Sequence, residues 1–271
     1  LGGAINIEKA NVTLDSCIFN GMNAGDGYAI YFTGNQQNDR LQILDCVFTD
    51  CGPTTNNCKS IIFTQSSSFL YDNNVINFTT DPQTKYAQGI QAKSSETIEI
   101  TNSKFTNCRG NLQGVGFAFN IDQDDDIMAA ISFDNVTFER CSSSHANPSI
   151  YYAHCQQRTY FKDVTFESIE QNYIIELSHP STQVDNFLFS SCSFIGCRAD
   201  GDGGGIGLKA NNIELLQFES CTFDDLVTTN NGGSVAFSST TNDLNTEFSR
   251  CRFNNSHANI GASLSFSIDK S

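Results

Sequence analysis

The sequence predicts an all-β fold: a single right-handed parallel β-helix, or solenoid, of about nine coils with three short strands per coil. Three observations predict it. A phenylalanine recurs about every 29 residues along the chain, further apolar residues recur at fixed offsets from it, and apolar and polar residues alternate with period two in between. Alternation of this kind is typical of strands, because successive side chains of a strand point to opposite faces.

The recurring phenylalanines define the repeat and serve as its anchors. In a solenoid each coil rises by one inter-strand spacing, about 4.8 Å, so residues at equal offsets stack into columns. We therefore expect the anchors to form one interior column of stacked rings, the core ladder. The nine anchors are Phe19, Phe48, Phe78, Phe105, Phe138, Phe166, Phe194, Phe223 and Phe253.

The residues around each anchor repeat as well. Five residues before the anchor, eight of the nine coils carry an apolar residue, and the exception is Asn73. Two residues before it, the side chains are mostly small or apolar, and five of them are cysteines. The offset between these two inward positions is odd, so the chain must bend between them. Polar pairs such as Ser190-Ser191 and Glu219-Ser220 occur there and predict a corner.

Antiparallel sandwiches and propellers also contain many short strands at regular spacing. A propeller blade needs some 40 or more residues, and a sandwich rarely repeats its core so closely, so both are less consistent with this repeat. We expect one continuous domain over residues 1–271. Because the chain starts and finishes in strand-like motifs, we expect it to be either a segment of a longer protein or a unit that stacks end to end in a filament.

Charge and cysteine content restrict the partners and the compartment. With 30 acidic and 15 basic residues the net charge is −15, which disfavours binding to nucleic acids and to anionic lipid surfaces. No stretch reaches the roughly 20 apolar residues that a membrane span requires. Eleven cysteines without paired CxxC motifs indicate an oxidising compartment rather than a zinc site. We therefore expect an extracellular or cell-surface protein.

Short motifs link the repeat to known families. The start Gly2-Gly3-Ala4-Ile5, its variants Gly204-Gly205-Ile206 and Gly232-Gly233-Ser234-Val235, and the recurring Phe-x-x-Cys resemble the GGAI and FxxN repeats of polymorphic outer-membrane autotransporter adhesins. The chain also resembles the broader pectin-lyase-like β-helix superfamily, over essentially its whole length. The resemblance implies a β-helix with an adhesive role. A eukaryotic surface protein with similar repeats is an equally consistent interpretation, because cysteine stands where the adhesins tend to carry asparagine.

Many β-helix proteins cleave polysaccharides, and such chemistry needs paired carboxylates or a calcium site beside a base. The motif set of polygalacturonase-like enzymes is not present, and the four histidines lie at different offsets. We therefore predict no catalytic residues, with a polysaccharide lyase or glycoside hydrolase as the alternative. Two acidic runs are weak candidates for structural calcium, although a solvated loop and a tight turn explain them as well. They comprise Asp122, Asp124, Asp125 and Asp126, and Asp200 and Asp202.

The cysteines fall into two groups. Those two residues before an anchor should point inward and fill the core as small apolar residues. Those three residues after an anchor lie near a corner, where Cys108 and Cys141 of successive coils have a separation that a disulfide tolerates. Cys51 and Cys58 bracket a loop that a second disulfide could close.

Four Asn-x-Ser/Thr sequons begin at Asn11, Asn77, Asn135 and Asn254. Their offsets place all four on the outward face, so a secreted eukaryotic chain could carry N-linked glycans there. Together these observations predict a non-catalytic extracellular structural or adhesive protein, with other surface or matrix proteins or glycans as partners and end-to-end self-association as a further possibility. The alternative is a polysaccharide-active or carbohydrate-binding β-helix. Apart from the calcium candidates we expect no cofactor.

Overall fold

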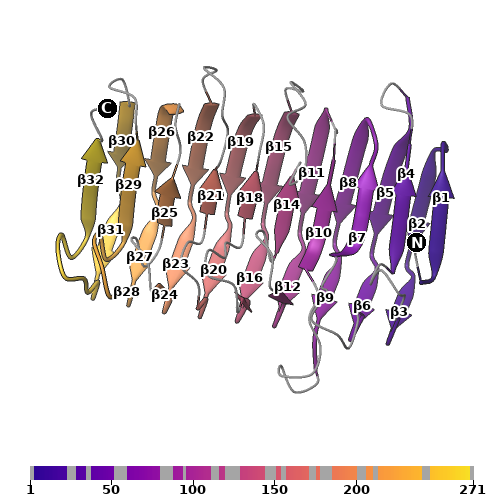
Figure 1. The fold of residues 1–271 in the computed structure, drawn as a ribbon, viewed down its shortest axis with the longest axis horizontal. Helices are drawn as coiled ribbons and strands as arrows, with labels where there is room; N and C mark the ends of the chain where they lie inside the picture. The colour runs from indigo at the N-terminus through magenta and orange to yellow at the C-terminus, as the bar shows by residue number, and fades with distance from the viewer. Residues whose placement is uncertain are drawn as a thin grey trace.

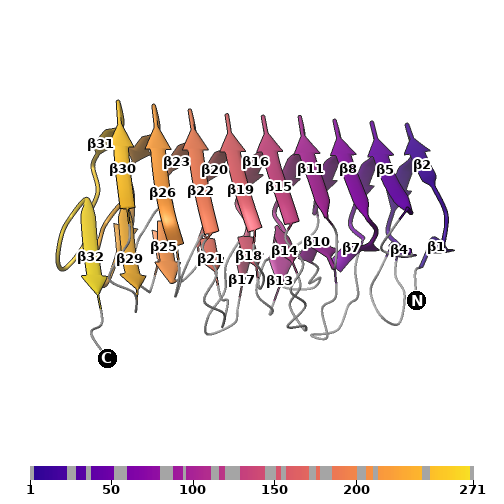
Figure 2. The same ribbon diagram turned by 90° about the horizontal axis from the view of Figure 1, so that it is seen from above.

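In the computed structural model the chain winds into a rod, and the two termini lie at opposite ends (Figures 1 and 2). The structure describes residues 3–22, 29–34, 38–51, 60–79, 88–93, 96–110, 116–119, 129–143, 151–153, 157–170, 175–177, 185–199, 206–209, 213–239 and 245–268. Regular secondary structure within these ranges consists of strands. No helix in the described part of the chain is long and apolar enough to cross a membrane.

The strands form three long faces, and neighbouring strands are parallel, as β11 is with β8 and β15. The first face contains β1 (Ile5–Glu8), β4 (Ile30–Thr33), β7 (Ser60–Gln65), β10 (Gln88–Ala92), β14 (Phe117–Phe119), β18 (Tyr151–Ala153) and β21 (Ile175–Leu177), and then β25 (Ile206–Lys209), β29 (Val235–Ser239) and β32 (Leu264–Ile268) as a separate sheet.

The second and third faces are sheets of nine strands each. The second sheet contains β2 (Val12–Asp15), β5 (Arg40–Leu44), β8 (Ser68–Asp72), β11 (Thr97–Thr101), β15 (Ala129–Asp134), β19 (Gln157–Lys162), β22 (Asp185–Ser190), β26 (Ile213–Glu219) and β30 (Asn245–Ser249). The third contains β3 (Ile18–Asn20), β6 (Val47–Thr49), β9 (Val75–Asn77), β12 (Lys104–Thr106), β16 (Thr137–Glu139), β20 (Thr165–Glu167), β23 (Ser193–Ile195), β27 (Thr222–Asp224) and β31 (Arg252–Asn254). Two short pairs, β13 (Arg109–Gly110) with β17 (Ser142–Ser143) and β24 (Arg198–Ala199) with β28 (Val227–Thr228), follow the third sheet.

Stacked aromatic columns fill the interior. On the third sheet the ring of Phe166 lies parallel to those of Phe138 and Phe194, with centroids 5.3 and 4.9 Å apart. On the second sheet the Phe161 and Phe189 rings stack at 4.7 Å. Such offset ring contacts add to the apolar burial that drives folding. The predicted ladder of anchors therefore exists, with one correction.

Phe78 is not a member of the ladder. Strand pairing places Ile76, not Phe78, beside Phe48 and Phe105, so the anchor of this coil lies two residues earlier than predicted. A shift of two residues leaves every side chain on the same face, so alternation alone does not distinguish the two registers. Phe78 is nonetheless buried, just after the end of β9. With the corrected register, the residue five before the anchor is the buried Tyr71, so all nine coils are apolar there.

The predicted corner between the second and third sheets is present in every coil. Three residues before each anchor the backbone is left-handed, with φ between 51° and 56° in Ser16, Asp45, Asn73, Asp163, Ser191, Ser220, Asn135 and Arg250 and 48° in Asn102. A single residue in this conformation turns the chain sharply and lets both flanking residues point inward. Asn and Asp tolerate the conformation better than most residues, which explains the polar pairs found there.

Candidate functional site

The outer face of the second sheet, together with its corner, carries regular columns of polar side chains, and we call this surface the polar face. In β5, β8 and β11 the inward residues are buried and the outward ones are partly or fully exposed; in β11, for example, Glu99 is exposed between the buried Ile98 and Ile100. Equivalent outward residues lie one inter-strand spacing apart, about 4.8 Å. Figure 2 shows the strands of the second sheet side by side along the rod, so their outward side chains form rows along it.

Carboxylates on this and the adjoining face hold successive coils together. Asp72 accepts hydrogen bonds from Thr101 Oγ1 at 2.6 Å and from Asn102 Nδ2 at 2.9 Å, both on the next coil. Asp134 pairs with Lys162 Nζ at 2.8 Å. Equivalent contacts between neighbouring coils join Asp45 to Asn73, Asp50 to Thr79, Asn102 to Asn135, Glu219 to Arg250, Asp224 to Asn254 and Gln217 to Glu247.

Glu139 has the most clearly perturbed carboxylate. Its oxygens lie 2.6 Å from Lys104 Nζ and 2.7 Å from Arg140 Nη2. The hydrogen bond from Lys104 is the largest cause that lowers the pKa of Glu139, and the charge of Arg140 adds to it. Glu139 is therefore held in its ionised form.

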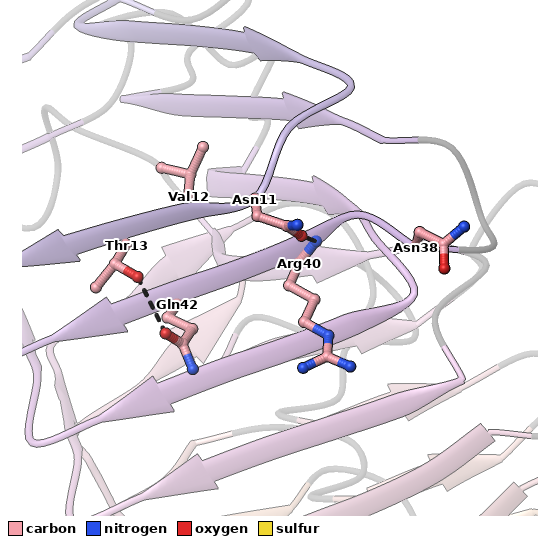
Figure 3. A pocket seen from close by; sticks show the side chains of 6 residues that line it. All are labelled: Asn11, Val12, Thr13, Asn38, Arg40 and Gln42. Atoms are coloured by element: carbon pink, nitrogen blue, oxygen red, sulfur yellow. Dashed lines mark hydrogen bonds between the residues drawn. The ribbon is translucent and has the colours of Figure 1, made fainter.

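A hollow of about 500 Å³ opens near the N-terminal end of the polar face (Figure 3). It is lined by Asn11, Val12, Thr13, Asn38, Arg40 and Gln42. Strand pairing sets Thr13 beside Gln42, and Asn11 precedes β2 beside Arg40. Two contacts fix the amides: Asn11 Oδ1 accepts from the Arg40 backbone N–H at 3.0 Å, and Gln42 Oε1 accepts from Thr13 Oγ1 at 3.0 Å.

The structure does not test the sequence-predicted acidic sites. Asp122, Asp124, Asp125, Asp126, Asp200 and Asp202 lie outside the described residues. Within the described ranges, no group of three or more His, Cys, Asp or Glu side chains is arranged to hold a metal ion. Sequence reasoning missed Thr13, Asn38, Arg40 and Gln42. Thr13, Arg40 and Gln42 could have been found from the sequence, because the alignment that identified the core also places them at outward positions of their strands.

The predicted bridge between Cys108 and Cys141 is not present. Cys108 and Cys141 are both buried and both free, and Cys141 Sγ donates to the carbonyl oxygen of Phe105 at 3.6 Å. The hydrogen bond that the Cys108 thiol donates to Cys141 and the burial of the thiol hold the pKa of Cys108 well above its usual value, which disfavours the reactive thiolate. Cys51 is buried, and its Sγ donates to the Phe19 carbonyl oxygen at 3.5 Å. Cys58 lies outside the described residues, so the Cys51–Cys58 bridge stays a prediction.

The inward cysteines predicted as core filler are confirmed in their placement. Cys46, Cys192 and Cys221 are buried, whereas Cys17 and Cys251, in the terminal coils, are partly exposed. Burial is the main cause that raises the pKa of Cys192 above its usual range. Burial also raises the pKa of Cys197, a cysteine of the other group, three residues after an anchor, to about 12.

The sequon asparagines lie on the outside of the rod. Asn11 and Asn135 are exposed, and Asn77 and Asn254 are partly exposed. The amide nitrogen of Asn135 donates to Asn102 Oδ1 at 2.9 Å, and that of Asn254 donates to Asp224 Oδ1 at 2.7 Å. At Asn11 the hydrogen bond is made by the amide oxygen, which accepts from the Arg40 backbone N–H, and not by the amide nitrogen.

Comparison with known proteins gives one match. The family model described as a right-handed β-helix region matches residues 2–189 of the chain. No curated protein and no solved structure matches it.

Proposed function

The chain belongs to the right-handed β-helix family, and on that premise we propose that it is a non-catalytic structural or adhesive protein of the extracellular space or cell surface. The use of the outward carboxylates is the observation that carries this proposal. On the described faces several of them bind groups of the neighbouring coil, as Asp72, Asp134 and Asp224 do. Carboxylates used in this way stabilise the stacking of coils.

The lowered pKa of Glu139 also favours a structural role of this carboxylate over a catalytic role in glycoside cleavage. A general acid in such an enzyme needs a carboxyl group whose pKa is raised, so that it still carries a proton near neutral pH. The pKa of Glu139 is shifted the opposite way, by the hydrogen bond from Lys104. This arrangement suits an ion pair that fixes two neighbouring coils.

The polar face supports an adhesive role. Most positions in its columns present hydroxyl, amide or charged groups about 4.8 Å apart, with Leu70 and Leu188 among the exceptions, and this suits an extended partner such as a glycan or a matrix protein. The outward sequons Asn11 and Asn135 support an extracellular location, because N-glycans are added to secreted chains.

Incubation with a panel of plant and microbial polysaccharides tests the proposal. We expect neither new reducing ends nor unsaturated products above the level of a heat-denatured control, whereas some of the same polymers or matrix proteins should retain the folded protein in a pull-down. Reproducible product release by the folded protein would overturn the proposal in favour of the polysaccharide lyase or hydrolase alternative.

A further inference from the structure

Three inward cysteines of successive coils lie directly above one another, and we call them the thiol column. Cys192, Cys221 and Cys251 each come just before a strand of the third sheet, β23, β27 and β31 (Figure 1). The backbone N–H of Thr222 donates to the Cys192 carbonyl oxygen at 2.8 Å, and that of Arg252 donates to the Cys221 carbonyl oxygen at 2.9 Å. The three coils are therefore in register at the cysteines, and all three are free thiols.

The three sulfurs are held in the same way. Each Sγ lies 3.4 or 3.5 Å from the carbonyl oxygen two residues before it and equally close to that of an inward phenylalanine of the preceding coil: Phe161, Phe189 and Phe218. Sulfurs with equivalent contacts repeat at the spacing of the coils, so neighbours in the column are roughly 4–5 Å apart. A disulfide requires sulfurs about 2.0 Å apart, which disfavours a direct bond between them.

This spacing fits two thiolates that are bridged by one metal ion. A zinc–thiolate bond is about 2.3 Å long, and two bonds of this length in a line span about 4.6 Å. Zinc itself requires four ligands, and no group of three or more His, Cys, Asp or Glu within the described ranges is arranged to hold a metal. Soft monovalent ions such as Cu(I) prefer thiolates, and two sulfurs in a line are sufficient for them.

Accessibility and acidity distinguish one pair within the column. Cys251 is partly exposed, so an ion can reach it from solvent, whereas Cys192 is fully buried. A hydrogen bond from the Cys192 thiol is the largest cause that lowers the pKa of Cys221, against the effect of burial, and one from the Cys251 thiol adds to it. Burial raises the pKa of Cys192, which therefore stays protonated as a donor to the Cys221 sulfur.

We propose that Cys221 and Cys251 bind one soft monovalent metal ion between their sulfurs. Both thiols release their protons to solvent, two metal–sulfur bonds replace the water ligands of the ion, and the complex carries one negative charge. The Cys192 thiol donates a hydrogen bond to the Cys221 sulfur and stabilises that charge. Metal binding would add to the structural or adhesive role and does not depend on it.

Titration of the reduced full chain with Ag⁺, a soft monovalent ion, tests the proposal. Excess glutathione, a free monothiol, removes the ion from isolated thiols, and native mass spectrometry counts the ions that the protein retains. We expect the wild type to retain one ion more than Cys221→Val and one more than Cys251→Val. Valine fits this column, because Val136 and Val164 are buried at its equivalent positions in two earlier coils.

Two control variants separate this pair from the other thiols. Cys192→Val should keep the ion, because Cys192 is not one of the two ligands. Cys197→Val should also keep it, because the equivalent positions of the neighbouring coils hold Ile169 and Leu226 rather than cysteine. Thermal melting verifies that each variant is folded, and the partly exposed position of Cys251 makes its variant the safer of the two ligand substitutions.

The inference is overturned if the wild type retains no Ag⁺, or if it retains no more than a folded Cys251→Val or Cys221→Val protein. Loss of the ion in Cys192→Val or Cys197→Val would likewise contradict the assigned pair. Zn²⁺ is the metal control: we expect the wild type and Cys251→Val to retain equal amounts of it. Retention of Zn²⁺ that depends on Cys251 would show a site with more ligands than the linear bridge.

Discussion

At the scale of single residues, Asn74 shows how a polar side chain can replace an apolar one in the core. It is fully buried at a position where most other coils carry cysteine or valine. Its Nδ2 donates to the Ile43 carbonyl oxygen at 2.7 Å, and its Oδ1 accepts from the Cys46 backbone N–H at 2.6 Å. Both partners would otherwise be buried without these bonds, which is costly.

Replacing Asn74 should therefore destabilise the fold. We expect Asn74→Leu to lower the free energy of unfolding by about 2–4 kcal/mol, because two buried backbone groups lose their partner. Chemical denaturation measures this change. The control Asn20→Ala, at an exposed position of β3, should change it by less than about 0.5 kcal/mol. Equal stability of Asn74→Leu and the wild type would contradict this account of the core.

The buried thiols predict a pH dependence on the alkaline side. Burial raises the pKa of Cys197 from 9.0 to about 12. Because the folded pKa is above the unfolded one, the stabilisation is fully present below pH 9 and is lost as the pH rises from 9 to 12. Cys197→Val removes the titrating thiol and should reduce this decline. Valine should fit the site, because the equivalent positions of the two neighbouring coils hold the buried Ile169 and Leu226.

Stability curves of the wild type and of Cys197→Val between pH 7 and pH 11 test this prediction, and their difference removes the contribution of other titrating groups. Parallel curves would show that the thiol does not contribute. Slow reaction of Cys197 with a thiol reagent at pH 8 in the folded protein is expected for the same reason.

At the scale of elements, the left-handed corner determines the register of each coil. Strand alternation predicted which side chains point inward, and the polar pairs predicted where the chain bends. Neither pattern identified the correct anchor of the third coil. Phe78 and Ile76 are two residues apart, so alternation places both on the inward face and does not distinguish them. The position of the corner residue Asn73, at φ 54°, distinguishes them, and side-chain polarity alone does not identify such a conformation.

Substitutions at a corner should follow an order opposite to that in a strand. Ser191 has φ 54°, so Ser191→Gly should stabilise and Ser191→Val should destabilise, with a difference of about 2 kcal/mol in unfolding free energy. At Ser193, in β23, valine should be favoured over glycine. Thermal or chemical unfolding of the four variants tests the order, and the same preference at both positions would contradict the assigned corner.

At the scale of the whole molecule, repetition made the architecture predictable and the surface much less so. Core positions repeat because stacked coils need the same inward residue types at the same offsets. Outward positions vary from coil to coil, as with Thr13, Gln42 and Leu70 in one column. The hollow depends on one local combination of these residues, which the repeat does not encode. The repeat placed Cys108 and Cys141 at the same position of successive coils, but position in a repeat does not determine whether two thiols are bonded, and these two are separate thiols.

Distances along the rod test the central claim, that successive coils stack in register, most directly. Val47, Lys104, Thr165 and Thr222 hold equivalent outward positions on β6, β12, β20 and β27. Pulsed electron resonance between labels on unnatural amino acids should give about 19 Å for both Val47–Thr165 and Lys104–Thr222, and about 29 Å for Val47–Thr222, apart from the length of the labels, at about 4.8 Å per coil. Unequal values for the first two pairs, or a third distance that does not exceed them, would contradict the stacked solenoid and everything built on it.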